Sequence, residues 1–119
     1  MSAFEVTIYH NPACSTSRNV LAMIRDAGVA PKIVEYLKAP PSRTELETIL
    51  ARGGLRVREI LRKKAPPYAE LGLDDPALSD DVIFAAIAEH PVLIERPIVM
   101  SPKGVRLCRP KEKVFEVLP

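Results

Sequence analysis

The sequence predicts an α/β fold in which a small mixed sheet of four strands is flanked by helices. Near the amino terminus, two short segments rich in β-branched residues flank a segment with helical periodicity, and such a β-α-β unit gives two parallel strands. Near the carboxyl terminus, two short apolar segments are separated by Pro102-Lys103-Gly104, which is typical of an antiparallel hairpin. A sheet that contains both arrangements is mixed, with helices packed against it.

The β-α-β unit comes first in the chain. A strand is predicted at Glu5–Tyr9, because the segment is short, β-branched and aromatic and breaks at His10-Asn11-Pro12. A helix follows at Thr16–Ala27, where apolar residues recur at three- and four-residue spacing until Gly28 offers a stop. The second strand is predicted at Lys32–Leu37.

The middle of the chain is predicted to be a helical insertion. Ser42 and Glu45 have the spacing of a capping box, and Gly53-Gly54 ends the helix that they begin. Ser79 caps a later helix, with two aspartates in its first turn, that runs until Pro91. Between these helices we expect a short basic helix at Arg56–Lys63, a break at Pro66-Pro67 and a turn-rich stretch through Asp74-Asp75-Pro76.

The last part of the chain completes the sheet. Strands are predicted at Ile98–Ser101 and Val105–Leu107, and a closing helix at Lys111–Leu118. The resulting order is the thioredoxin-like arrangement, with too few strands for a flavodoxin-like sheet. We expect one domain over residues 1–119, since a chain of this length buries about two-thirds of its unfolded surface.

The composition excludes several classes of function. The chain carries 17 Lys and Arg against 15 Asp and Glu, so it lacks the bulk positive field that drives unspecific nucleic-acid binding. The longest apolar run, Val82–Ala88, is far shorter than a membrane span, and the amino terminus does not resemble a signal peptide. We therefore expect a cytoplasmic protein that binds neither nucleic acid nor membrane.

The chemistry is expected in the loop that enters the first helix. Cys14 lies where unpaired N–H groups and the helix dipole favour a thiolate, which is the nucleophilic form of cysteine. His10 could add positive charge when it is protonated, and the Ser17 hydroxyl could donate a hydrogen bond. The same helix end also suits an oxyanion.

Simpler interpretations of these residues remain open. Ser15, Thr16 or Ser17 could serve only as helix caps, and Cys14 could be an ordinary buried thiol. A zinc site is rejected, because its candidate ligands lack the paired close spacing of zinc ligands; these candidates are His10, Cys14, His90 and Cys108. For Cys108 we favour a packing role.

Three arginines near the ends of predicted elements form the second feature: Arg62, Arg96 and Arg109. Two of them precede proline, and an X-Pro bond before the third strand of a thioredoxin-like fold is commonly cis and beside the helix-end cysteine. Taken singly, each arginine could be a surface residue. Clustered guanidinium groups repel one another, so their convergence would call for a tetrahedral oxyanion that accepts hydrogen bonds from all three.

Four segments carry a resemblance to a known family. HNPACSTSRN, LRKKAPPYAELGL, HPVLIERPIV and GVRLCRP together resemble the glutathione- and glutaredoxin-dependent arsenate reductases of the ArsC family. The resemblance implies that Cys14 is the nucleophile, that His10 and Ser17 support it, and that Arg62, Arg96 and Arg109 hold the oxyanion. It also implies that arsenate is the substrate, that glutathione is a co-substrate with no cofactor or metal bound, and that glutaredoxin is the partner.

Three other classes of protein account for fewer of these residues. The phosphatase-like arsenate reductases are built on C-x5-R, and this chain has Val20 where that arginine would stand. Redox regulators of the same family that bind RNA polymerase typically carry C-x-x-C, whereas this chain has Cys14-Ser15-Thr16-Ser17. A monothiol glutathione-dependent oxidoreductase without an oxyanion substrate would not require the arginine set. The arsenate-reductase hypothesis is the one that uses all of these residues.

Overall fold

The computed structural model describes residues 4–119. The chain forms two compact units. One consists of the residues up to Ala39 together with Arg96–Pro119 and holds the sheet, and the other, Pro40–Glu95, is helical. The expectation of a single domain over residues 1–119 stays a prediction.

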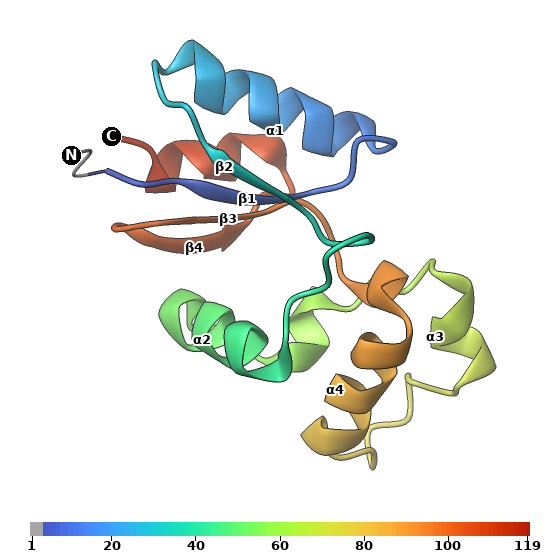
Figure 1. Cartoon of the computed structure of the whole chain (residues 1–119). Coiled ribbons are helices and arrows are strands. Elements are labelled where there is room, and N and C mark those ends of the chain that lie inside the picture. The colour runs from blue at the N-terminus through green and yellow to red at the C-terminus, as the bar shows by residue number, and fades with distance from the viewer. Residues whose placement is uncertain (1–3) are drawn as a thin grey trace. The chain divides into compact units, whose positions relative to one another are not determined.

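The first unit contains a four-stranded mixed sheet of strand order β2-β1-β3-β4 (Figure 1). β1 (Thr7–His10) pairs in parallel with β2 (Lys32–Glu35), and the crossover between them is α1 (Ser15–Asp26). β3 (Ile98–Ser101) is antiparallel to both β1 and β4 (Gly104–Leu107). This is the thioredoxin-like α/β fold that the sequence predicts, with each strand within three residues of its predicted ends.

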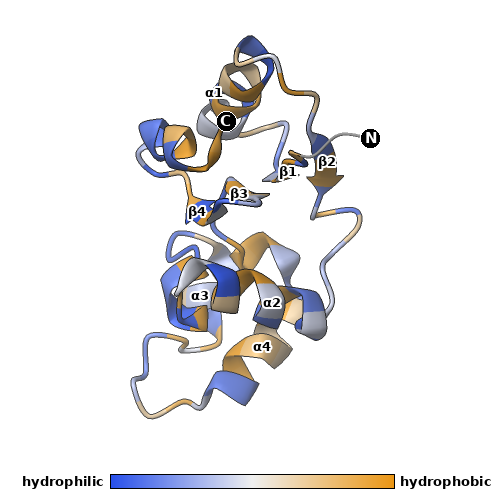
Figure 2. Cartoon of the chain, turned by 90° about the vertical axis from the view of Figure 1, so that its left-hand side faces the viewer, coloured by the Kyte–Doolittle hydropathy of each residue, from blue (hydrophilic) through white to orange (hydrophobic). Residues whose placement is uncertain are grey.

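The helical unit confirms the predicted insertion, with one error. Its longest helices are α2 (Arg43–Gly53) and α4 (Asp80–Glu89), and the hydroxyls of Ser42 and Ser79 cap them as predicted. The segment Pro66-Pro67 is not a break, because α3 (Pro66–Glu70) begins there. Proline is tolerated in the first turn of a helix, where its missing N–H has no partner to lose. Figure 2 shows α4 as hydrophobic over most of its length.

Three short segments are 3-10 helices. For two of them the sequence predicts a helix without giving its type, and the third is not predicted. The basic segment at 56–63 contains only the four-residue η1 (Val57–Ile60). Pro91–Leu93 forms η2, and the predicted closing helix is η3 (Lys111–Val117). Periodicity of apolar residues does not separate a short 3-10 helix from an α-helix over so few turns.

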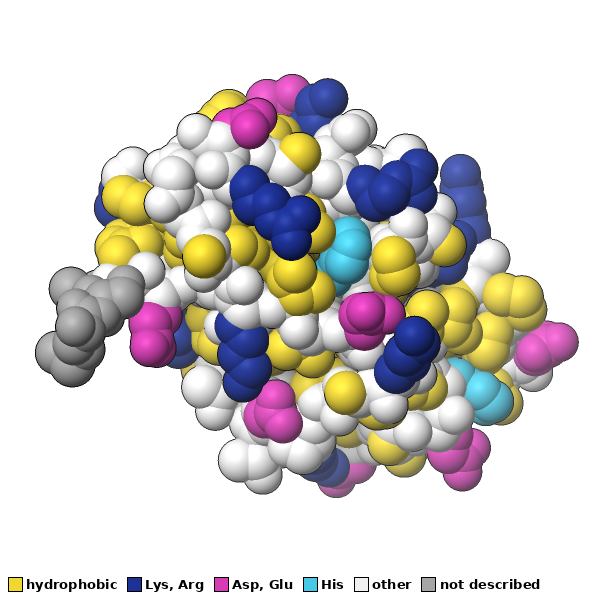
Figure 3. All heavy atoms as spheres, turned by 45° about the horizontal axis from the view of Figure 1, so that its top comes forward, with side chains coloured by type: hydrophobic (Ala, Val, Ile, Leu, Met, Phe, Trp, Pro, Cys, Tyr) yellow, Lys and Arg dark blue, Asp and Glu magenta, His cyan; other side chains and the backbone are white. Residues whose placement is uncertain are grey.

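The described surface carries charges of both signs. Figure 3 shows Lys and Arg side chains interspersed with Asp and Glu on the face that it draws. Within residues 4–119, none of the helices combines the length and the apolar character that crossing a membrane requires.

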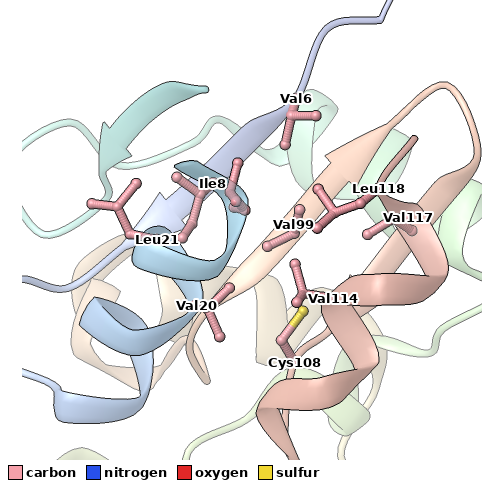
Figure 4. Packing of buried hydrophobic residues seen from close by; sticks show 10 residues of the cluster. Val6, Ile8, Val20, Leu21, Val99, Cys108, Val114, Val117 and Leu118 are labelled. Carbon is pink, nitrogen blue, oxygen red and sulfur yellow. The ribbon is translucent and has the colours of Figure 1, made fainter. Parts of the chain in front are cut away.

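A compact core in the first unit fixes the position of α1 (Figure 4). Val20 and Leu21 of α1 belong to one buried cluster with Ile8 of β1, Val99 of β3 and Val114 of η3. The helices α1 and η3 therefore cover the same face of the sheet, as Figure 1 also shows. Burial of several aliphatic side chains, at about 1.5–3 kcal/mol each, holds the amino-terminal end of α1 at the edge where β1 ends.

Candidate functional site

The candidate site lies on the loop that joins β1 to α1. Cys14 is the N-cap residue of α1 and has an extended backbone, with φ −95° and ψ 122°. The backbone N–H groups of Ser17 and Thr16 face its sulfur. These groups belong to the first turn of the helix, where they have no carbonyl partner within the helix. Cys14 thus lies where the sequence places it, at the positive end of the helix dipole.

The surroundings of Cys14 lower the pKa of its thiol. Partial burial is the largest single influence and raises the pKa, because it disfavours the charged thiolate. The N–H of Ser17, the charge and hydrogen bond of the Arg96 guanidinium, and the N–H of Thr16 act in the opposite direction and together outweigh burial. More of the thiol is therefore ionised at neutral pH than in a free cysteine, and the thiolate is the form that attacks.

Arg96 is the arginine that the structure places against the sulfur. It is half-buried and follows the helical insertion, directly before β3. The peptide bond between Arg96 and Pro97 is cis, as the sequence predicts for this position. A guanidinium at this point can interact both with a thiolate and with an oxyanion that the thiolate attacks.

Arg109 is tied to the segment that carries Arg96. Its Nη1 donates a hydrogen bond of 3.1 Å to the Arg96 carbonyl oxygen, and its own bond to Pro110 is also cis. The side chain is exposed, and this bond uses one of the five N–H donors of its guanidinium.

Arg62 lies in the helical unit, directly after η1. Its backbone N–H donates to the Leu93 carbonyl at 2.7 Å, and its side chain is half-buried. The role of Arg62 in holding an oxyanion rests on the resemblance and stays a prediction.

His10 and Ser17 form a buried pair. His10 Nδ1 lies 2.6 Å from the Ser17 hydroxyl oxygen, and that oxygen also accepts a hydrogen bond of 3.1 Å from the N–H of Asn11. Burial lowers the pKa of the imidazole below 6.5, so His10 is neutral at neutral pH. This corrects the expectation that a protonated His10 adds charge beside the thiol. Its contact with Ser17 instead fixes the loop against the helix.

Asn11 is a residue of the site that the sequence analysis did not single out. Its side-chain oxygen accepts from the N–H of Ala13 at 3.0 Å, and its carbonyl accepts from the N–H of Cys14 at 3.0 Å. These two bonds turn the chain sharply before the helix. The sequence carries a signal for this role of Asn11. An Asn-Pro pair between a strand and a helix is typical of a turn in which the Asn side chain bonds to the backbone.

Cys108 is separate from this chemistry. It is fully buried in the core of the first unit, which confirms the packing role that we favour. Burial, together with the charge of Glu116, raises the pKa of its thiol to about 12, so it stays protonated. Within the described residues, no three His, Cys, Asp or Glu side chains gather where a metal ion could be held.

A cavity adjoins the start of α1. It has a volume of about 260 Å³ and is lined by Thr16, Arg109, Pro110, Lys111 and Glu112. All five residues belong to the first unit. The sequence analysis did not predict it, because its two walls are separated by more than ninety positions of the chain.

A thioredoxin-like sheet, a cysteine of lowered pKa at the start of its first helix and an arginine against that sulfur together define the class of protein in which a single thiol is placed for nucleophilic attack. The sequence matches the model of the ArsC family over residues 9–117, and the chain belongs to this family.

Comparison with individual proteins agrees with this assignment. The chain is 61% identical to an arsenate reductase of Rhizobium meliloti (strain 1021) over 114 residues, which are 96% of this chain and 81% of that protein. It is 54% identical to an arsenate reductase of Escherichia coli (strain K12) over the same shares. Among solved structures, an arsenate reductase from Vibrio cholerae superposes with a TM-score of 0.93 at 49% identity, covering 98% of this chain and 100% of that chain.

Proposed function

We propose that this protein is an arsenate reductase in which the Cys14 thiolate attacks arsenate. Membership of the ArsC family supports the proposal, as do the arsenate reductases that resemble the chain over 96% of its length. The observation that carries it is the Arg96 guanidinium against the Cys14 sulfur, because this contact joins a nucleophile to an oxyanion-binding group.

In the first step, arsenate is held by Arg62, Arg96 and Arg109, which offset its charge and orient the arsenic toward Cys14. The sulfur forms a bond to arsenic, and one arsenic–oxygen bond breaks. The departing oxygen takes up protons and leaves as water. Arsenic remains in the +5 state in the resulting Cys14 adduct, so this step is a substitution and not yet a reduction.

The reduction requires two electrons from thiols outside the chain. Cys108 cannot supply them from its buried, protonated state. The sulfur of one glutathione bonds to the arsenic of the adduct, and a second arsenic–oxygen bond breaks, with its oxygen leaving as water. A glutaredoxin thiolate then attacks the sulfur of this glutathionyl group, so the arsenic–sulfur bond breaks with its electron pair left on arsenic, which becomes +3. Water cleaves the remaining bond to Cys14 and releases arsenite, and a second glutathione takes the glutathionyl group from glutaredoxin as glutathione disulfide. The sum is one arsenate and two glutathione giving one arsenite, one glutathione disulfide and one water. We propose the cytoplasm, where such thiols stay reduced, as the place of this reaction.

Formation of arsenite from arsenate, with glutathione and glutaredoxin present, tests the proposal. The wild-type protein should produce arsenite, and Cys14→Ser should produce none above the background without enzyme, because a serine hydroxyl at this position is not ionised. The matched control is Cys108→Ala, which removes the other sulfur and should retain turnover in the folded fraction. Equal rates for wild type and Cys14→Ser would refute the proposal.

A further inference from the structure

The cavity beside the start of α1 differs from the rest of the site in its charge. Two of its lining side chains, Arg109 and Lys111, are cationic, and one, Glu112, is anionic. The Glu112 carboxylate would repel an inorganic oxyanion such as arsenate, because both are negatively charged. Two cations and one anion around a single cavity instead match a ligand that bears both carboxylate and ammonium groups.

The position of the cavity relates it to the nucleophile. Thr16 forms one wall, and its backbone N–H faces the Cys14 sulfur. The α-carbons of Cys14 and Thr16 are at most about 7 Å apart, since that is the reach of two residues of backbone. One wall of the cavity is therefore formed by a close chain neighbour of the nucleophile. The opposite wall is the start of η3, and in Figure 1 α1 and η3 begin at the same end of the unit.

Arg109 lies both in the lining of the cavity and next to Arg96. Its hydrogen bond to the Arg96 carbonyl holds it next to the residue that contacts the sulfur, and it also lines the cavity. A ligand in the cavity would therefore lie beside the arsenic adduct on Cys14 and not in its place.

The cavity is small and widely open to solvent. Pockets that enclose a whole drug-sized ligand measure roughly 300–1,000 Å³, and this one measures about 260 Å³. It suits one amino-acid-sized end of a longer molecule, whose remainder would extend out of the cavity toward the sulfur.

We propose that this cavity binds the zwitterionic amino-acid end of the thiol co-substrate, a small peptide thiol of the glutathione class. Lys111 and Arg109 donate hydrogen bonds to its carboxylate, Glu112 accepts hydrogen bonds from its ammonium, and the wall at Thr16 directs the thiol to the Cys14 adduct. The γ-glutamyl group of glutathione has both charged groups on one carbon, and its thiol is on the next residue. This inference rests on the proposed function, since it assigns a place to the reductant of that reaction.

Binding of S-methylglutathione tests the inference without turnover. This compound keeps both charged ends and cannot react, so its Kd can be measured by NMR titration of the wild-type protein. We expect saturable binding with shifts at Thr16 and Lys111, and a Kd raised about three- to tenfold in Lys111→Gln, the loss of one exposed charge-assisted hydrogen bond. Lys113→Gln, the same substitution two positions along η3 and outside the cavity, should leave the Kd within a factor of two.

Glu112 is tested with a second ligand. N-acetyl-S-methylglutathione lacks the ammonium, so it should bind wild type more weakly than S-methylglutathione does, while Glu112→Gln should bind the two compounds equally. The inference is overturned by no saturable binding, by equal effects of Lys111→Gln and Lys113→Gln, or by an acetylation penalty that persists in Glu112→Gln. Arsenite production by wild type, measured in parallel, separates these results from a failure of the proposed function.

Discussion

The imidazole of His10 and the hydroxyl of Ser17 are hydrogen-bonded at 2.6 Å, and both side chains are buried. The pair joins the end of β1 to the first turn of α1. Because Cys14 lies between these two residues in the chain, the pair fixes the loop on which the thiol stands.

The buried imidazole makes stability dependent on pH. The pKa of His10 is lowered below 6.5 in the folded state, so the unfolded chain binds the proton more readily. Stability is therefore fully present above about pH 6.5 and falls as the pH drops through the folded pKa. Urea unfolding between pH 5 and 8 should show this loss in the wild type.

The variant His10→Asn should reduce the slope of stability against pH over that interval, because asparagine keeps a polar group near the Nδ1 position and does not titrate. An unchanged slope in His10→Asn would mean that another group is responsible.

Arg96 should control the ionisation of Cys14. Replacing it with glutamine removes a positive charge and a hydrogen bond from the sulfur, so the pKa of the thiol should rise and alkylation by iodoacetamide at pH 7 should slow down. Arg96→Lys keeps the positive charge, so the Cys14 pKa in this variant should lie between those of the wild type and Arg96→Gln. The thiolate absorbance near 240 nm, followed against pH, measures the effect.

Arg109→Gln is the comparison for this experiment. Arg109 contacts the Arg96 carbonyl, whereas Arg96 itself acts on the Cys14 sulfur through its charge and a hydrogen bond, so replacing Arg109 should change the Cys14 pKa less than Arg96→Gln does. Equal shifts in both variants would contradict the assignment of the effect to Arg96.

Loss of Arg62 should weaken the handling of arsenate. Removing one charge-assisted hydrogen bond costs about 1.5–3 kcal/mol, which corresponds to a decrease of about 10- to 150-fold in kcat/KM for arsenate in Arg62→Ala. Lys63→Ala, a neighbouring exposed cation, should change it little. Unaltered saturation curves for Arg62→Ala would remove Arg62 from the oxyanion site.

Arg58 should stabilise the helical unit without taking part in the chemistry. Its guanidinium donates to the carbonyls of Leu73, Asp75 and Leu78 at 2.6–3.2 Å, which holds the turn-rich segment between α3 and α4. Arg58→Ala should lower the free energy of unfolding by about 1.5–3 kcal/mol. Arg58→Lys should recover only part of this loss, since one ammonium cannot span three carbonyls. A midpoint equal to that of wild type in urea would contradict this role.

The sequence predicts the parts of the fold that depend on local signals. Ser42 and Ser79 cap the helices that their spacing indicates, and the hairpin at Pro102-Lys103 forms where the two apolar segments meet. The error at Pro66 arises because the local signal is ambiguous. Proline both ends helices and begins them, and which of the two occurs depends on the residues that precede it.

Some features of the site could likewise be predicted from the sequence, and others could not. The position of Cys14 at a helix start follows from local pattern, whereas the cis bond after Arg96 is expected from the thioredoxin-like fold. The lowered pKa of His10 depends on burial, and the cavity between Thr16 and Lys111 depends on how distant segments pack. Neither the lowered pKa nor the cavity can be predicted from a stretch of neighbouring residues.

The central claim is that the ionised sulfur of Cys14 and the arginines act on one oxyanion, and alkylation of Cys14 in the presence of arsenate tests it most directly. In the absence of glutathione, arsenate should slow the reaction of Cys14 with iodoacetamide in a saturable manner, and the protection should require a higher arsenate concentration in Arg62→Ala. Alkylation of wild-type Cys14 at an unchanged rate under saturating arsenate would contradict the account.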